Sequence, residues 1–202
     1  MARSGQHFLF IKRSRGCGPL DTIFRNTPKF VTFWILLILT NSGFSQKESS
    51  AELTDFTGKN YKLQYPASWT LDTSKSLGPA IFFFSPLENT EDKFRENVNV
   101  LIQDLKGEDI NLSRYKEITD KQIRDFASDG EILESSIVRK NNQEFYRITY
   151  TMSQGQFRVK ITSVCFIQNE KAYLSTFSAE VDKYDTYKKI AEHILNSFKV
   201  SR

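Results

Sequence analysis

Residues 132–179 have the sequence ILESSIVRKNNQEFYRITYTMSQGQFRVKITSVCFIQNEKAYLSTFSA, in which four strand-like runs follow one another closely. The runs are separated by short polar turns, Asn141-Asn142, Ser153-Gln154-Gly155 and Asn169-Glu170-Lys171. Connections this short join antiparallel neighbours, because a parallel pair needs a crossover of about a dozen residues or more. The stretch therefore predicts a four-stranded antiparallel meander.

Three further strands are predicted before the meander. Tyr61–Tyr65 alternates apolar and polar residues and is followed by Pro66, which removes a hydrogen-bond donor from the ladder. Ala80–Phe84 is wholly apolar, and we expect it to be buried on both faces of the sheet. Asn97–Gln103 again alternates, with valines and an isoleucine on one face. Together these runs predict an antiparallel sheet of about six to seven strands.

Two segments change to the helical period. Residues 112–126 place their apolar side chains within one arc of a helical wheel, with Asn111 as the expected N-cap and an end before Gly130. Residues 184–198 form a second apolar stripe, and Asp182 with Asp185 resembles a capping box. The first arc consists of Leu112, Tyr115, Ile118, Thr119, Ile123 and Phe126. We expect an α+β fold in which helices sandwich the central antiparallel sheet, an α/β/α arrangement.

The N-terminal segment differs in charge from the rest of the chain. The 202 residues carry a net charge of +4, yet residues 1–45 hold six of the 28 basic side chains and one of the 24 acidic ones. The remainder is nearly neutral, which argues against nucleic acid as a partner, because phosphate binding needs clustered Lys and Arg. A hydrophobic content of 39% is sufficient for one packed domain.

This N-terminal segment has the features of a signal peptide. Basic residues precede the apolar run Phe30–Leu39, and the small residues Gly43 and Ser45 follow it. We predict cleavage after Ser45 and a periplasmic or secreted protein. Ten helical residues rise about 15 Å, half of a hydrocarbon core of about 30 Å. A membrane anchor that keeps Phe30–Leu39 is the alternative.

The predicted organisation follows from this leader. Residues 1–45 form the leader, 46–60 a flexible lead-in, and 61–202 the folded domain, with order beginning near Tyr61. Cys17 is lost with the leader, so the remaining Cys165 has no partner within the mature chain.

Few residues are candidates for catalysis. The chain has two histidines, His7 in the leader and His193, which the helical wheel directs toward water. Cys165 shares a strand face with apolar neighbours, which is typical of a core position rather than of a nucleophile. We expect a non-enzymatic protein with no catalytic, cofactor-binding or metal-binding residues and no cofactor.

Clustered carboxylates provide the alternative. The run Glu88, Glu91, Asp92 and Glu96 could collect a divalent cation, but it matches no calcium-loop consensus and is interleaved with bases. We expect a solvated loop. A carboxylate- or metal-dependent enzyme would instead require convergence of several acids in one pocket. The candidates are Glu88, Glu91, Asp92, Glu96, Asp104, Glu108 and Asp109.

Three segments carry a resemblance to a known family. Tyr65-Pro66-Ala67-Ser68-Trp69, the run Ala80–Phe84 and Ile194-Leu195-Asn196-Ser197-Phe198 resemble the PsbP-like superfamily, which includes bacterial PsbP-related and DcrB-like exported proteins. The similarity covers about residues 56–200. It implies a central antiparallel sheet between helices and a non-catalytic role in binding or assembling a complex, with another envelope protein as the expected partner. Contact with the membrane is expected only through an uncleaved leader.

Overall fold

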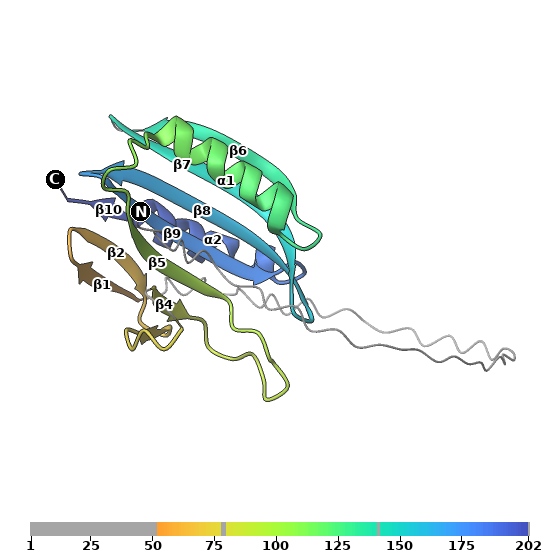
Figure 1. Ribbon diagram of the computed structural model, residues 1–202. Helices are drawn as coiled ribbons and strands as arrows, with labels where there is room; N and C mark the ends of the chain where they lie inside the picture. Colours follow the sequence, from red (N-terminus) through yellow and green to blue (C-terminus); the bar gives the residue numbers. More distant parts are fainter. Residues whose placement is uncertain (1–51, 78–79, 141, 202) are drawn as a thin grey trace, which may run out of the picture. The chain divides into compact units, whose positions relative to one another are not determined.

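The computed structural model describes residues 52–77, 80–140 and 142–201. The predicted leader 1–45, its cleavage site after Ser45, the apolar run 30–39 and Cys17 lie outside these ranges. Within them the chain forms two helices and ten strands (Figure 1). Neither helix in the described part combines the length and the apolar content that crossing a bilayer requires.

The strands form two antiparallel sheets. The larger contains β3 (Thr70–Asp72), β4 (Ile81–Phe84), β5 (Asn97–Asp104), β6 (Glu131–Lys140), β7 (Gln143–Gln154), β8 (Phe157–Gln168) and β9 (Lys171–Glu180). Its strand order is β3-β4-β5-β9-β8-β7-β6. The smaller contains β1 (Leu53–Gly58), β2 (Tyr61–Pro66) and β10 (Lys199–Val200), in the order β1-β2-β10. The helices of the described ranges are α1 (Leu112–Phe126) and α2 (Tyr184–Ser197).

The predicted meander is confirmed as β6-β7-β8-β9, with each strand antiparallel to the next. Its turns contain residues in the left-handed backbone region, with φ of 59° at Asn142, 63° at Gly155 and 51° at Asn169. Gly and Asn tolerate positive φ better than other residues do, so the turn residues seen in the sequence are those that this geometry favours. Short turns then make sequence neighbours into sheet neighbours.

The two faces of the larger sheet bury separate apolar clusters. Val164 and Cys165 are consecutive in β8, yet Val164 belongs to the cluster under α2 and Cys165 to the cluster under α1. This division follows from the two-residue period of a strand, which sends successive side chains to opposite faces. Helix α1 covers β6 and β7, whereas α2 and the smaller sheet cover the other face (Figure 1). The α/β/α prediction is confirmed.

The N-terminal part of the fold differs from the prediction. Order does not begin near Tyr61, because Leu53–Gly58 is strand β1 and pairs with β2 along its whole length. The polar side chains of β1 suggested a flexible lead-in, but backbone hydrogen bonding to β2 stabilises the strand. Phe56 also packs its ring against Phe83, with 5.4 Å between the centroids. Strand β2 was expected in the main sheet, but it pairs with β1 and β10 and so belongs to the smaller sheet.

Some local predictions are also corrected. Asn111 does cap α1, since its Oδ1 accepts the Arg114 N–H at 2.9 Å. The N-cap of α2 is Lys183, which makes no side-chain capping bond, so the capping box of Asp182 and Asp185 is wrong. Phe126, the last residue of α1, is 75% exposed although it lies on the predicted apolar arc. In β4 only Phe83 is fully buried, so burial of the whole strand on both faces is wrong.

Candidate binding groove

An apolar groove of about 220 Å³ lies where the β6–β7 hairpin meets the end of α2. Its floor consists of Val164 from β8, Leu195 from α2 and Phe198, all of which are buried. Phe145 of β7 and Phe166 of β8 form its walls and remain partly exposed. The rest of its described lining is polar or basic, namely Lys140, Gln143, Asn196 and Lys199. The groove therefore combines an apolar interior with a hydrophilic rim.

Strand alternation and the end of α2 place the three phenylalanines together. Phe145 and Phe166 occupy the same face of neighbouring strands, with ring centroids 5.3 Å apart. Helix α2 ends when Phe198 adopts an extended conformation and its N–H bonds to the Leu195 carbonyl at 3.4 Å. The chain then turns into β10, and the Phe198 ring lies 5.9 Å from that of Phe166. Such tilted ring pairs are favourable beyond the area that they bury.

The groove is bordered by positive charge. Lys140 and Lys199 are exposed at its rim, and Lys62 lies directly opposite Lys199 where β2 pairs with β10. The described lining contains no carboxylate to offset these ammonium groups. An acidic group near this rim would be attracted electrostatically, although salt weakens attraction between exposed charges.

The residues that carry the family resemblance are structural. Ser197 Oγ accepts the Gln64 N–H at 2.8 Å and donates to the Ile194 carbonyl at 2.7 Å, which ties α2 to β2. Trp69 is buried, and its ring lies 6.4 Å from that of Tyr187 on α2. The Ser197 bonds hold the C-terminal end of α2 against β2 beside the groove, whereas Trp69 packs near the N-terminal end of the helix.

The acidic run is not a single solvated loop. Glu96 is only 2% exposed, and its carboxylate accepts a hydrogen bond from Ser85 Oγ at 3.4 Å. Burial raises the pKa of Glu96, and the carboxylates of Asp92 and Glu88 raise it further. The prediction of a solvated loop is therefore wrong for Glu96, because the chain must bring it inward to continue into β5. Glu91 is exposed, as predicted.

The other acids of this loop have local partners. Glu88 forms an ion pair with Lys183 and accepts the Tyr187 hydroxyl at 3.2 Å. Asp92 accepts the backbone N–H groups of Glu88 at 3.0 Å and Phe94 at 3.1 Å. These bonds organise the loop after β4 and connect it to α2.

The seven candidate carboxylates do not form one site. Asp104, Glu108 and Asp109 are exposed around the β5–α1 connection and not in the loop after β4. Among the described residues, no group of three or more His, Cys, Asp or Glu side chains has an arrangement that could hold a metal ion. The convergence that a carboxylate-dependent enzyme requires is therefore not seen in the described ranges.

Helix α1 carries a buried carboxylate that the sequence pattern did not predict. Asp120 is 5% exposed and accepts hydrogen bonds from Tyr146 Oη at 2.6 Å, Ser135 Oγ at 2.8 Å and Lys116 Nζ at 2.6 Å. Burial by itself raises the pKa of Asp120, but the hydrogen bonds from these three donors outweigh it and lower the pKa overall. The helical wheel placed Asp120 outside the apolar arc, and the signal available was Lys116 four residues earlier. The network fastens α1 to β6 and β7.

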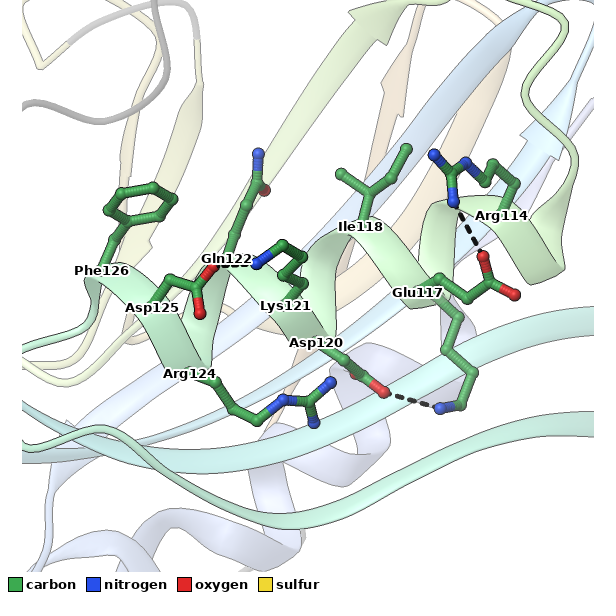
Figure 2. Close-up of a pocket in the computed structure, with 10 residues that line it drawn as sticks. Arg114, Glu117, Ile118, Asp120, Lys121, Gln122, Arg124, Asp125 and Phe126 are labelled. Carbon is green, nitrogen blue, oxygen red and sulfur yellow. Dashed lines mark hydrogen bonds and ion pairs between the residues drawn. The ribbon is translucent and has the colours of Figure 1, made fainter.

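The outer surface of α1 has a shallow hollow whose described lining comes entirely from that helix. Figure 2 shows its side chains, including the ion pairs Arg114–Glu117 and Lys121–Asp125. Exposed pairs of this kind contribute about 0–1 kcal/mol, so they are typical of a solvated helix surface. Phe126 projects at the end of this row. The hollow has no opposite wall in the described ranges, which makes the groove the better-formed site.

The two remaining catalytic candidates lie where the sequence predicted. Cys165 is 1% exposed beneath α1, and burial raises the pKa of its thiol well above the ordinary range. A thiolate nucleophile needs the opposite shift, so the core assignment of Cys165 is confirmed. His193 is exposed on α2, also as predicted.

Comparisons with known proteins agree with this architecture. The PsbP family model matches residues 51–200. The structure is similar to that of cyanobacterial PsbP (CyanoP) from Synechocystis, with 18% identity and a TM-score of 0.57, covering 79% of this chain and 98% of the other. It is also similar to LpqN of Mycobacterium tuberculosis, a protein involved in cell envelope biogenesis, with 12% identity and a TM-score of 0.59 over 76% of this chain and 92% of the other. No curated protein matches the chain in sequence.

Proposed function

Because this chain belongs to the PsbP family, we propose that it is an exported, non-catalytic accessory module that binds another protein of the cell envelope through the Phe145–Phe166–Phe198 groove. The observation that carries the proposal is the partly exposed aromatic wall of this groove. Its described lining includes no carboxylate, histidine or cysteine, which favours binding over catalysis. By contrast, Asp120 and Cys165 are enclosed in the fold.

The size and charge of the groove suggest what it binds. Pockets for drug-sized ligands and cofactors have volumes of about 300–1,000 Å³, so a groove of about 220 Å³ suits one or two apolar side chains better. Lys140 and Lys199 favour acidic residues beside such an anchor. We infer a protein partner that presents an exposed Leu, Phe or similar side chain flanked by Asp or Glu.

A photo-crosslinking experiment tests the groove. A photoreactive phenylalanine analogue replaces Asn196 at the rim, and in a control it replaces His193, which is exposed on α2 but does not line the groove. We expect the Asn196 probe to capture a defined protein segment that contains an apolar residue next to acids. Capture should decrease in Lys199→Glu and persist in Lys188→Glu, a control on the exposed part of α2. Equal capture from both probes would contradict the proposal.

Export is tested separately. The basic N-terminal segment and the apolar run Phe30–Leu39 support a cleaved leader. Intact-mass measurement of the protein recovered from cells should give an N-terminus at Gln46, and cell fractionation should find it outside the cytoplasm. A retained N-terminal segment in a membrane fraction would support the anchored alternative instead.

A further inference from the structure

Strand β6 is an open edge of the larger sheet. It is the last strand of the order, and in the described part of the chain it pairs only with β7. It is ten residues long and exposes apolar side chains, with Leu133 49% and Ile137 38% accessible. A long edge strand with exposed apolar residues presents unpaired backbone groups to another strand.

The regular part of this edge is Glu134–Lys140. A register shift between Ile132 and Glu134 bends the strand before it. At the other end Lys140 pairs with Gln143 across a two-residue connection, and in such hairpins the closing pair is hydrogen-bonded. Because hydrogen-bonded and non-hydrogen-bonded pairs alternate, Ser135, Ile137 and Arg139 direct their backbone groups away from β7.

The side chains of this segment divide between the two faces of the sheet. Ser135 bonds to Asp120 of α1, so Ser135, Ile137 and Arg139 are on the α1 side. Ser136 lies opposite Arg147, which pairs with Glu192 of α2. Ser136, Val138, Lys140 and Glu134 are therefore on the α2 side.

We propose that β6 pairs antiparallel with β6 of a second copy of this chain, around a twofold axis through Ile137. A twofold axis perpendicular to the sheet keeps every side chain on its own face, so residues pair only with residues of the same face. With Ile137 opposite Ile137, Ser135 lies opposite Arg139 and Glu134 lies opposite Lys140. The pairing would join two seven-stranded sheets into one.

Charge complementarity selects this register. It brings Glu134 and Lys140 together twice, once on each side of the axis, and it buries the exposed Ile137 against its copy. Shifting the axis to Ser136 would place Glu134 opposite Val138 and leave Lys140 opposite the irregular residues before Glu134. Opposite charges on directly opposed residues stabilise a sheet and like charges destabilise it.

The oligomeric state of the protein recovered after expression of the full chain tests the proposal. Analytical ultracentrifugation over a concentration series should give twice the mass of one chain by the time the protein reaches about 100 μM. Ile137→Lys should dissociate the dimer, whereas Leu77→Lys, at a residue 61% exposed in the loop after β3, should not. Glu134→Lys and Lys140→Glu should each weaken the dimer about tenfold, because each creates two like-charge contacts.

The double variant Glu134→Lys/Lys140→Glu provides the decisive measurement. It exchanges the charges within both contacts and should restore the wild-type dimer. Circular dichroism and thermal melting confirm that each variant is folded. A wild-type protein of one-chain mass at every concentration overturns the proposal, as does a folded double variant that remains monomeric. Ile137 and Glu134 do not line the groove, so Ile137→Lys and Glu134→Lys test the dimer independently of it, whereas Lys140→Glu also changes a rim residue.

Discussion

Under α2 the sheet buries a mainly aromatic and aliphatic core and the carboxyl group of Glu96, which has one side-chain hydrogen-bond donor, Ser85. Under α1 it buries the carboxylate of Asp120, which has three side-chain donors. The α2 side ends in a groove where Phe145 and Phe166 stay partly exposed. The α1 side has a network in which Asp120 is surrounded by its partners. Buried polar groups with hydrogen-bond partners stabilise the fold. Apolar side chains that stay exposed can instead bind a partner. The following predictions test this distinction.

The largest expected effect is in the core on the α2 side. Trp69→Ala should lower the free energy of unfolding by about 3–5 kcal/mol, because it leaves a cavity between the sheet and α2. Urea unfolding followed by circular dichroism measures the change. Phe126→Ala is the matched control, since that ring is 75% exposed and its removal should cost less than about 0.5 kcal/mol. Equal decreases in the free energy of unfolding would contradict the burial of Trp69 and the exposure of Phe126.

A smaller decrease in the free energy of unfolding is expected from a substitution on the α1 side. Asp120→Asn should cost about 1–3 kcal/mol at neutral pH, because the ion pair with Lys116 and the charge-assisted bonds from Tyr146 and Ser135 are weakened. The lowered pKa of Asp120 means that its ionised form stabilises the fold above the ordinary Asp pKa. This stability is lost as the pH falls through the folded-state pKa.

Urea unfolding of wild type and Asp120→Asn over a pH series measures that dependence. The difference in stability between them should shrink in acid. Asp125→Asn serves as the control, because its partner Lys121 is well exposed and the pair contributes little. A difference that is constant with pH would show that the charge of Asp120 does not stabilise the fold.

A gain in stability is expected from a substitution at the centre of the larger sheet. Ser175 is fully buried in β9, and its Oγ has no hydrogen-bond partner in the described part of the chain. Ser175→Ala should therefore stabilise the protein by about 1 kcal/mol, because it removes an unsatisfied hydroxyl. Thr162→Val is the comparison, since the Thr162 hydroxyl bonds Thr149 at 2.9 Å and its loss should destabilise. Thermal melting of both variants distinguishes the two outcomes.

The smallest effect is expected at Glu96. Its raised pKa means that the folded state holds a proton more tightly than the unfolded state does, so stability decreases as the pH rises from the ordinary Glu pKa through the raised value. Glu96→Gln should raise the melting temperature at neutral pH, and the gain should disappear below the ordinary Glu pKa. Glu91→Gln, at an exposed residue of the same loop, should change little. A melting temperature lowered at neutral pH would contradict this account.

The sequence predicted most of the larger sheet because its information is local. Alternation along 132–179 and the short turns between the strands determine pairing, since neighbours in the chain become neighbours in the sheet. The stripes of α1 and α2 were likewise visible, although Phe126, the last residue of α1, is exposed rather than buried. Residues whose role depends on one short segment, such as Asn111 and Cys165, were therefore assigned correctly.

The smaller sheet was not predictable in the same way. Strand β2 pairs with β10, which is more than a hundred residues away, and β1 is stabilised by backbone pairing that leaves no apolar pattern. The groove also depends on contacts between segments that are distant in the sequence, because Phe145, Phe166 and Phe198 come from three separate elements. Strand alternation places Phe145 and Phe166 on the same face, and the helical stripe includes Phe198, but neither pattern predicts that the three rings meet.

Local periodicity thus determined the elements of this protein and the face that each buries, since both depend on residues a few positions apart. The assembled fold determined the environment of each polar group. Glu96 and Asp120 look like other surface acids in the sequence, and their burial depends on Ser85, Tyr146 and other residues distant in the chain. Burial and hydrogen bonding determine the pKa of each carboxyl group, and both arise only when segments that are separate in the sequence pack together.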